Sequence, residues 1–189
     1  VDAGKLENAS HELTATHKNF DRTVKRTVTV NDEGSKKIVF SSSANTYSTQ
    51  NIPPIKETDI QDTTNPYGTT KLLIEKILRD LSNCNGFEVI KLRYFNPIWA
   101  HSSWNIWEEP EWIPNNLFPF IFKVLTGELK ELSVYGDDYE TIDGTWIRDY
   151  IDVVDLIDAH VKAYAFLEKQ SNKKWCNEVF NVGTGKWLS

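Results

Sequence analysis

A tyrosine and a lysine four residues apart are the side chains of this sequence best suited to chemistry. Tyr67 and Lys71 stand in the segment YGTTK, and apolar residues follow at helical spacing from 74 to 81. Positions four apart share one face of a helix, so we expect the phenol and the ammonium side by side. A cation there favours the phenolate and lowers the pKa of the Tyr67 hydroxyl, which makes a general base. Such pairs are also common on helix surfaces, so the neighbouring segments must decide.

The elements around this pair predict a parallel sheet. The apolar run KIVF at 37–40 enters three serines at 41–43, which is typical of a buried strand ending in small polar residues. The pattern predicts a helix over 67–81, with Pro66 near its start and Gly86 past its end. FEVIKLRYF at 87–95 predicts the next strand, so the order is strand, helix, strand. Serines at the carboxyl end of such a strand lie where these sheets bind ligands.

The remaining segments carry weaker signals. RTVKRTVTV at 22–30 indicates a strand or a poor helix, and 1–35 as a whole is weakly organised. Beyond 100 we expect a loop rich in Trp, Pro and Glu, a helix over 115–126 and a short strand over 132–135. A helix after Asp152 carries His160 on its apolar face, where we interpret it as a packed histidine. A last strand over 179–182 runs into Gly183.

Composition excludes several classes of protein. The 189 residues hold 21 Lys and Arg against 27 Asp and Glu, a formal net charge of −6, which disfavours nucleic acid as a partner. No apolar run reaches the roughly 18 residues of a membrane helix, so we expect no membrane association. Cys84 and Cys176 lack zinc-site or disulfide-scaffold spacing, so we expect no metal and a reducing, cytoplasmic location.

Taken in order, several segments resemble one family. They are FSSSA at 40–44, NPYGTTK at 65–71, LRYFNP at 92–97, IPNNL at 113–117, DGT at 143–145, RDYI at 148–151 and NVGTGK at 181–186. Together they resemble the UDP-glucose 4-epimerases, within the extended short-chain dehydrogenases/reductases. RYFNP followed by IPNNL is the feature that favours this branch over the related dehydratases and decarboxylases.

The resemblance implies an α/β fold. We expect part of an NAD-binding Rossmann parallel sheet, without its N-terminal half, and part of a small substrate-binding domain. Residues 1–35 would be a weakly matching segment and 36–100 the C-terminal half of the Rossmann domain. Residues 101–189 would hold substrate-domain elements interleaved with the last Rossmann elements. The chain is therefore expected to cover the central part of such an enzyme, and a homodimer is implied as well.

The resemblance also implies residue roles in interconverting UDP-galactose and UDP-glucose. Tyr67 would take the proton from the sugar 4-hydroxyl, Ser43 would hydrogen-bond the same oxygen, and Lys71 would hold the nicotinamide ribose. Hydride would pass from sugar C4 to NAD and return to the other face of a 4-keto intermediate. The implied cofactor contacts are Ser41, Ser42, Tyr67, Lys71, Tyr94, Phe95 and Asn19. The implied substrate contacts are Ser43, Asn96, Asn115, Asn116, Leu117, Leu132, Ser133, Tyr135 and Arg148.

The sequence also departs from the family. No glycine-rich strand–turn–helix for a pyrophosphate occurs within 1–35. Tryptophan stands where the family has glycine, at positions expected to need a positive φ or close approach: Trp99, Trp104, Trp107, Trp112, Trp146 and Trp187. A non-catalytic relative and a different nucleotide-sugar dehydratase or decarboxylase therefore stay open as alternatives. Purely structural roles stay open for some residues too, since Arg148 could pair with a neighbouring aspartate, and Asn115 and Asn116 could cap a helix.

Overall fold

The computed structural model describes residues 9–16, 23–30, 36–101, 103, 116–134, 136–169 and 176–189. The predicted site residues Asn19, Asn115 and Tyr135 lie outside these ranges, as do Trp104, Trp107 and Trp112. The chain divides into two units, Val1–Lys37 and Ile38–Ser189. In the first unit, β1 (Ala9–Thr16) pairs antiparallel with β2 (Thr23–Val30), so a strand is what forms over most of 22–30.

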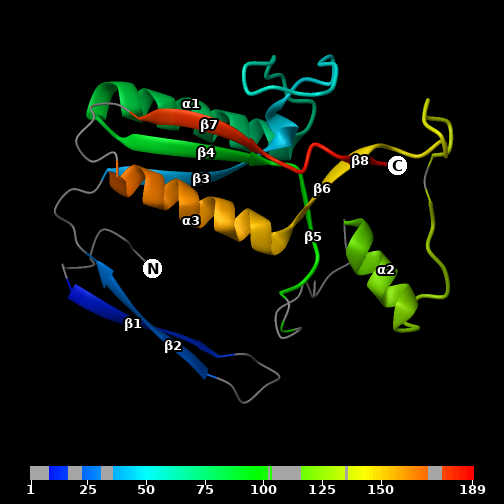
Figure 1. Cartoon of the computed structure of the whole chain (residues 1–189), viewed down its shortest axis with the longest axis horizontal. Helices are drawn as coiled ribbons and strands as arrows, with labels where there is room; N and C mark the ends of the chain where they lie inside the picture. The colour runs from blue at the N-terminus through cyan, green and yellow to red at the C-terminus, as the bar shows by residue number, and fades with distance from the viewer. Residues whose placement is uncertain are drawn as a thin grey trace. The chain divides into compact units, whose positions relative to one another are not determined.

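A three-stranded sheet lies at the centre of the second unit, in the order β3-β4-β7. Its strands are β3 (Lys37–Ser43), β4 (Glu88–Tyr94) and β7 (Asn177–Val182). β4 and β7 pair in parallel, with Val89 opposite Asn177, and Figure 1 shows all three strands pointing the same way. The expected parallel α/β sheet is therefore confirmed, and the carboxyl ends of its strands lie at one edge.

Two long helices, α1 (Pro66–Asn85) and α3 (Val153–Lys169), cover opposite faces of β4. Ile90 and Leu92 of β4 form the main apolar core with Ala163 and Leu167 of α3. Successive side chains of a strand point to opposite faces, and Arg93 correspondingly meets Glu75 of α1. The sheet thus has an apolar face toward α3 and a buried polar contact toward α1.

The sequence sets both ends of α1. The side chain of Asn65 accepts a 2.7 Å hydrogen bond from the Gly68 N–H, and Pro66 occupies the first helical position. Gly86 ends the helix in the left-handed region (φ +69°) and donates its N–H to the Ser82 carbonyl. The helix extends past the apolar stripe at 67–81 and ends at Gly86, where its end was expected.

Close packing holds the start of α1 against the short 3-10 helix η2 (Ala44–Thr46) that follows β3. A Cβ at Gly68 would lie 2.3 Å from the backbone oxygen of Asn45, so only glycine fits there. The first turn of α1, which carries Tyr67, therefore lies directly beside the end of β3.

A second small sheet has the order β5-β6-β8. Its strands are β5 (Asn96–Ile98), β6 (Arg148–Asp152) and β8 (Trp187–Leu188), and α2 (Leu117–Leu125) lies on the same side of the molecule (Figure 1). β5 pairs in parallel with β6, whereas β8 pairs antiparallel with β6. The prediction of a strand over 132–135 is wrong for the described residues, because 131–134 are exposed and pair with no other strand.

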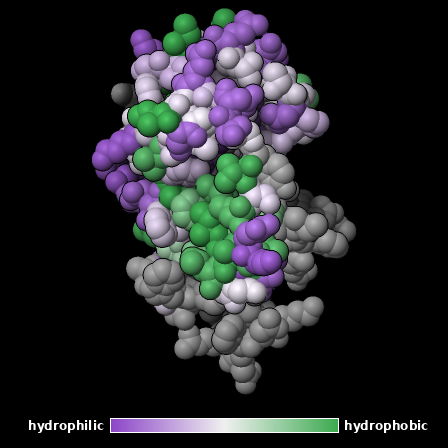
Figure 2. All heavy atoms as spheres, turned by 90° about the vertical axis from the view of Figure 1, so that its right-hand side faces the viewer, coloured by the Kyte–Doolittle hydropathy of each residue, from purple (hydrophilic) through white to green (hydrophobic). Residues whose placement is uncertain are grey.

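Apolar side chains form an exposed patch on the side that carries α2 (Figure 2). The exposed large apolar residues of α2 are Leu117, Phe122 and Leu125. Among the helices that the structure describes, none is long and apolar enough to cross a bilayer.

Candidate active site

The expected neighbours Tyr67 and Lys71 lie together at the carboxyl end of β3. Lys71 Nζ is 5.5 Å from the centroid of the Tyr67 ring and 5.2 Å from that of Phe40. The same ammonium donates a 2.9 Å hydrogen bond to the backbone carbonyl of Ser41. Lys71 has no carboxylate partner among the described residues, so two of its three N–H donors face no strong acceptor there. Tyr67 itself is about half exposed, as a group that meets a ligand must be.

The hydroxyl of Ser41 points to the opposite side of β3, toward α3. Its Oγ lies 2.8 Å from Nε2 of His160. Burial raises the pKa of the nearby Tyr94 and Tyr67 adds to that rise, whereas the Ser41 hydroxyl opposes it. The carboxyl ends of β3 and β4 and the start of α1 therefore bring the hydroxyls of Ser41, Tyr67 and Tyr94 near the ammonium of Lys71.

Ser42 and Ser43 are buried, each with its own partner. The Ser42 hydroxyl donates to Oε1 of Glu75, and the Ser43 Oγ accepts a 3.2 Å hydrogen bond from the Asn45 N–H as the N-cap of η2. The predicted cofactor contact of Ser42 and the predicted catalytic contact of Ser43 stay predictions. A contact of Ser42 with a cofactor would use its backbone, because its hydroxyl is committed to Glu75.

A buried ion pair beneath the serines was not foreseen from the sequence. Arg93 and Glu75 have side chains only 4% exposed and make two hydrogen bonds, of 2.9 and 2.7 Å. Arg93 Nη1 also donates to the Tyr47 hydroxyl at 2.8 Å. Burial alone would raise the pKa of Glu75, but the hydrogen bonds from Arg93 and Ser42 hold it below its usual value. This network fixes β3, α1 and β4 relative to one another.

Asn96 and Asp149 join the two sheets at the other side of the edge. The Asn96 side-chain amide donates to the Asp149 carbonyl at 3.1 Å, so one end of its side chain is positioned by β6. The Asp149 carboxylate accepts from the backbone N–H groups of Thr184 and Gly185, each at 2.9 Å. A Cβ at Gly183 would lie 2.6 Å from Asp149 Oδ2, so a larger residue there would have to displace this carboxylate. Phe95 extends the ladder by donating its N–H to the Val182 carbonyl.

Arg148 is half-buried without a carboxylate partner in the described part of the chain. Its guanidinium lies 4.7 Å from the centroid of the Trp146 ring and donates to the Ile147 carbonyl. Burial lowers its pKa from the ordinary arginine value. The alternative of a pair with a neighbouring aspartate is not seen, because Asp149 binds the 183–185 turn and Asp152 accepts from the Val154 N–H.

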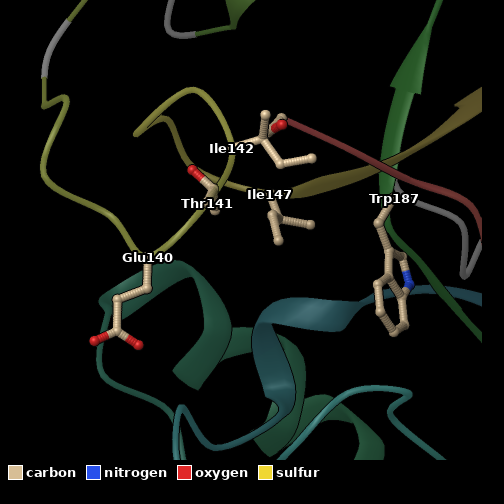
Figure 3. A pocket seen from close by; sticks show the side chains of 6 residues that line it. Glu140, Thr141, Ile142, Ile147 and Trp187 are labelled. Carbon is tan, nitrogen blue, oxygen red and sulfur yellow. The ribbon is translucent and has the colours of Figure 1, made fainter.

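The other predicted substrate residues lie on or after α2. Asn116 occupies the N-cap position of α2, but its side chain makes no capping hydrogen bond. Leu117, Leu132 and Ser133 are exposed. A separate hollow of about 540 Å³ is lined by Thr141, Ile142, Ile147 and Trp187 (Figure 3), and it includes none of the predicted site residues. The substrate contacts of these residues stay predictions.

Comparison with known proteins shows the family of the chain. The model of the NAD dependent epimerase/dehydratase family matches residues 2–183. The chain belongs to the NAD dependent epimerase/dehydratase family. Among curated relatives in this family, the UDP-glucose 4-epimerase of Bacillus subtilis is 52% identical over 157 residues, which are 82% of this chain and 45% of the relative. The chain therefore spans about half the length of the curated relatives it matches.

Solved structures of family members agree. The UDP-glucose 4-epimerase of Bifidobacterium longum in complex with NAD+ and UDP has a TM-score of 0.73 and 49% identity, with 82% of this chain and 45% of that chain covered. The Stenotrophomonas maltophila enzyme, with bound NAD and formylated UDP-arabinopyranose, has a TM-score of 0.75 and 45% identity, over 81% and 45% of the two chains. The expected partial Rossmann fold is therefore confirmed.

The tryptophans expected to replace family glycines differ in backbone conformation. Trp99 has φ +74° and is the one non-glycine residue with positive φ in the described part of the chain. Its ring lies 5.5 Å from that of Phe118. Trp146 and Trp187, which the structure also describes, do not have a positive φ, so of these three tryptophans only Trp99 has the expected conformation.

Proposed function

We propose that this chain carries the catalytic residues of an NAD-dependent UDP-glucose 4-epimerase, with Tyr67 as the base. The observation that carries the proposal is the position of Lys71. It is held by the Ser41 carbonyl beside the exposed phenol of Tyr67, at the carboxyl edge of a parallel sheet. Family membership and the UDP-glucose 4-epimerase relatives support the same assignment.

The donor set at this edge fits the nicotinamide end of NAD. Lys71 spends one N–H on the Ser41 carbonyl and keeps two others, which suit the paired hydroxyls of a ribose. Tyr94 and Phe95 lie where β4 ends and offer flat rings for the nicotinamide. When bound, NAD supplies the hydride acceptor of the reaction. The pyrophosphate of NAD would be bound by residues other than Lys71, Tyr94 and Phe95.

The residues of the chain would then handle the proton. The ammonium of Lys71 stabilises the phenolate of Tyr67, which takes the proton from the sugar 4-hydroxyl as hydride leaves C4. Ser43, at the end of β3, would bind the same oxygen and keep it aligned. After the 4-keto sugar turns over, Tyr67 returns its proton as hydride arrives on the other face, so the reaction consumes no acid or base.

Arg148 and Asn96 would position the nucleotide-sugar. A half-buried guanidinium without a carboxylate partner in the described residues is suited to the diphosphate of a UDP-sugar. Asn96 would contact the sugar from the end of β5, and Asn116 and Leu117 from the start of α2. Leu132 and Ser133 would line the uracil pocket. The proposed enzyme would be a homodimer, as the resemblance implies, and would be located in the cytoplasm.

The test places these residues in a complete enzyme. The aligned segment of the Bacillus subtilis relative is replaced by that of this chain, and conversion of UDP-galactose to UDP-glucose is measured with added NAD+. We expect activity that Tyr67→Phe lowers by about 10²–10⁴-fold, the usual contribution of a general base. Tyr164→Phe, at an exposed tyrosine of α3, is the matched control and should not change the rate.

Two outcomes would contradict the proposal. An inactive chimera that still binds NAD+ would favour a non-catalytic relative. A 4-keto-6-deoxy product would favour a dehydratase instead. Loss of activity in Tyr67→Phe without loss of NAD+ binding would support the role of Tyr67 as base.

A further inference from the structure

The geometry points to His160 as a positioning residue that fixes Ser41 and, through the Ser41 carbonyl, the ammonium of Lys71. His160 lies on α3, across the sheet from the helix that carries Lys71. The inference rests on the proposed function, because it concerns the lysine of that same site. It assigns a task to a histidine that the sequence analysis interpreted only as a packed side chain.

Both ring nitrogens of His160 are hydrogen-bonded, and one bond determines the other. Nδ1 lies 2.8 Å from the backbone carbonyl of Leu156, one turn earlier in α3. A carbonyl only accepts, so the proton must be on Nδ1. In the neutral ring Nε2 is then an acceptor, and the Ser41 hydroxyl, 2.8 Å away, must donate to it. The helix backbone therefore sets the direction of the Ser41 hydrogen bond.

Ser41 is bound at both of its polar ends. Its hydroxyl is held by His160 on the α3 side of β3, and its carbonyl accepts from Lys71 of α1. The Tyr94 ring, at the end of β4, packs close by, with its centroid 6.3 Å from that of the His160 ring. One residue of β3 thus links α3 to the candidate catalytic helix α1.

The hydrogen bonds of Ser41 to His160 and Lys71 orient the Ser41 hydroxyl and carbonyl, in addition to any packing. The main apolar core beside this link is made by Ile90, Leu92, Ala163, Leu167 and Cys176, whereas His160 is hydrogen-bonded through both of its ring nitrogens. Loss of the His160–Ser41 hydrogen bond frees the Ser41 hydroxyl to turn. The peptide that presents its carbonyl to Lys71 then loses its support from α3.

Histidine tautomers give a direct test that needs no turnover. Long-range ¹H–¹⁵N correlation spectra of the full chain at neutral pH report which ring nitrogen carries the proton. We expect His160 as the Nδ1–H tautomer, with an Nε2 shift that moves on Ser41→Ala. A protonated Nε2, or an Nε2 shift indifferent to Ser41→Ala, would overturn the inference.

Two amide substitutions separate the two hydrogen bonds of the ring. Asparagine reaches the Nδ1 position and keeps the bond to Leu156, whereas glutamine reaches the Nε2 position and keeps an acceptor for Ser41. In the active chimera we expect His160→Asn to lower kcat about tenfold with an unchanged KM for UDP-galactose. His160→Gln should retain at least half of the kcat of the parent chimera.

Other outcomes would contradict the positioning role. Equal losses in His160→Asn and His160→Gln would show that only packing matters, and an unchanged kcat in His160→Asn would show that Ser41 needs no support. The tautomer spectrum is measured on the chain alone, so it stands or fails separately from the proposed activity. An inactive parent chimera would contradict the proposed function, but the spectrum would still decide the state of His160.

Discussion

Trp99 has a left-handed backbone conformation, so an unfavourable backbone energy and a favourable contact of its ring act at the same residue. Trp99 has φ +74°, a conformation that costs a side chain with a Cβ about 1–2 kcal/mol. The contact of its ring with that of Phe118, 5.5 Å away between centroids, offsets part of this cost. Comparing whole-residue replacements would mix the two energies, so the backbone cost must be isolated.

Glycine and alanine variants isolate the backbone cost, because both remove the ring. Trp99→Gly should be more stable than Trp99→Ala by about 1 kcal/mol, since only glycine adopts positive φ without strain. At Trp146, which has no positive φ, the order should reverse by about 0.5–1 kcal/mol. Urea unfolding of the four variants measures both differences. The same sign at the two positions would contradict this account of Trp99.

Residues of the candidate site differ in how well the sequence predicts them. Tyr67 and Lys71 follow from helical spacing together with the serine-ended strand before them, and the structure brings them together. The link between Ser41 and His160 spans 119 positions, and no local rule connects them. Arg93 and Glu75 likewise look like ordinary surface charges in the sequence, and only the parallel pairing around β4 shows that both are buried.

At the scale of elements, the start of α1 depends on a missing side chain. Gly68→Ala would place a Cβ 2.3 Å from the Asn45 backbone oxygen, so helix and turn must separate. We expect a loss of about 1–3 kcal/mol in the free energy of unfolding. Gly86→Ala is the matched control, because its Cβ would meet open space and only the φ of +69° costs about 1 kcal/mol.

Denaturant midpoints of the two variants give the comparison. A smaller loss for Gly68→Ala than for Gly86→Ala would mean that the 44–46 turn yields easily to α1. In that case the position of Tyr67 beside the end of β3 would not depend on this packing.

The longer elements could be predicted and the shorter ones could not. α1, α3 and β4 carry long apolar patterns, and β3 and β7 carry shorter apolar runs, all of which local pattern detects. β5, β6 and β8 have two to five residues and exist because they pair with one another. The pattern at 132–135 looks equally strand-like, but its described residues have no neighbouring strand, so no ladder forms.

At the scale of the second unit as a whole, acid should act through Glu75. Its folded-state pKa is lowered, so the stabilisation is complete above the ordinary value of 4.5 and is lost as pH falls through the folded value. We expect the free energy of unfolding to fall with pH below about 4.5. Measuring urea midpoints across pH 3–7 tests this expectation.

Removing the carboxylate should remove that dependence at a large cost. Glu75→Gln leaves Arg93 buried without its counter-charge, which typically costs about 3–5 kcal/mol. Asp80→Asn, at a carboxylate that is 67% exposed, is the control and should leave stability nearly unchanged. A Glu75→Gln variant that keeps the full acid dependence of the parent would show that other carboxylates determine it.

The contact between Arg148 and Trp146 has an optical consequence. A guanidinium on the face of an indole changes the energy of its excited state, so the emission of Trp146 depends on where Arg148 is. An anion that draws the guanidinium away from the ring would alter that emission without any dye or label. We therefore expect Trp146, one of seven tryptophans in the chain, to contribute an emission change when an anion binds the arginine proposed to hold the diphosphate.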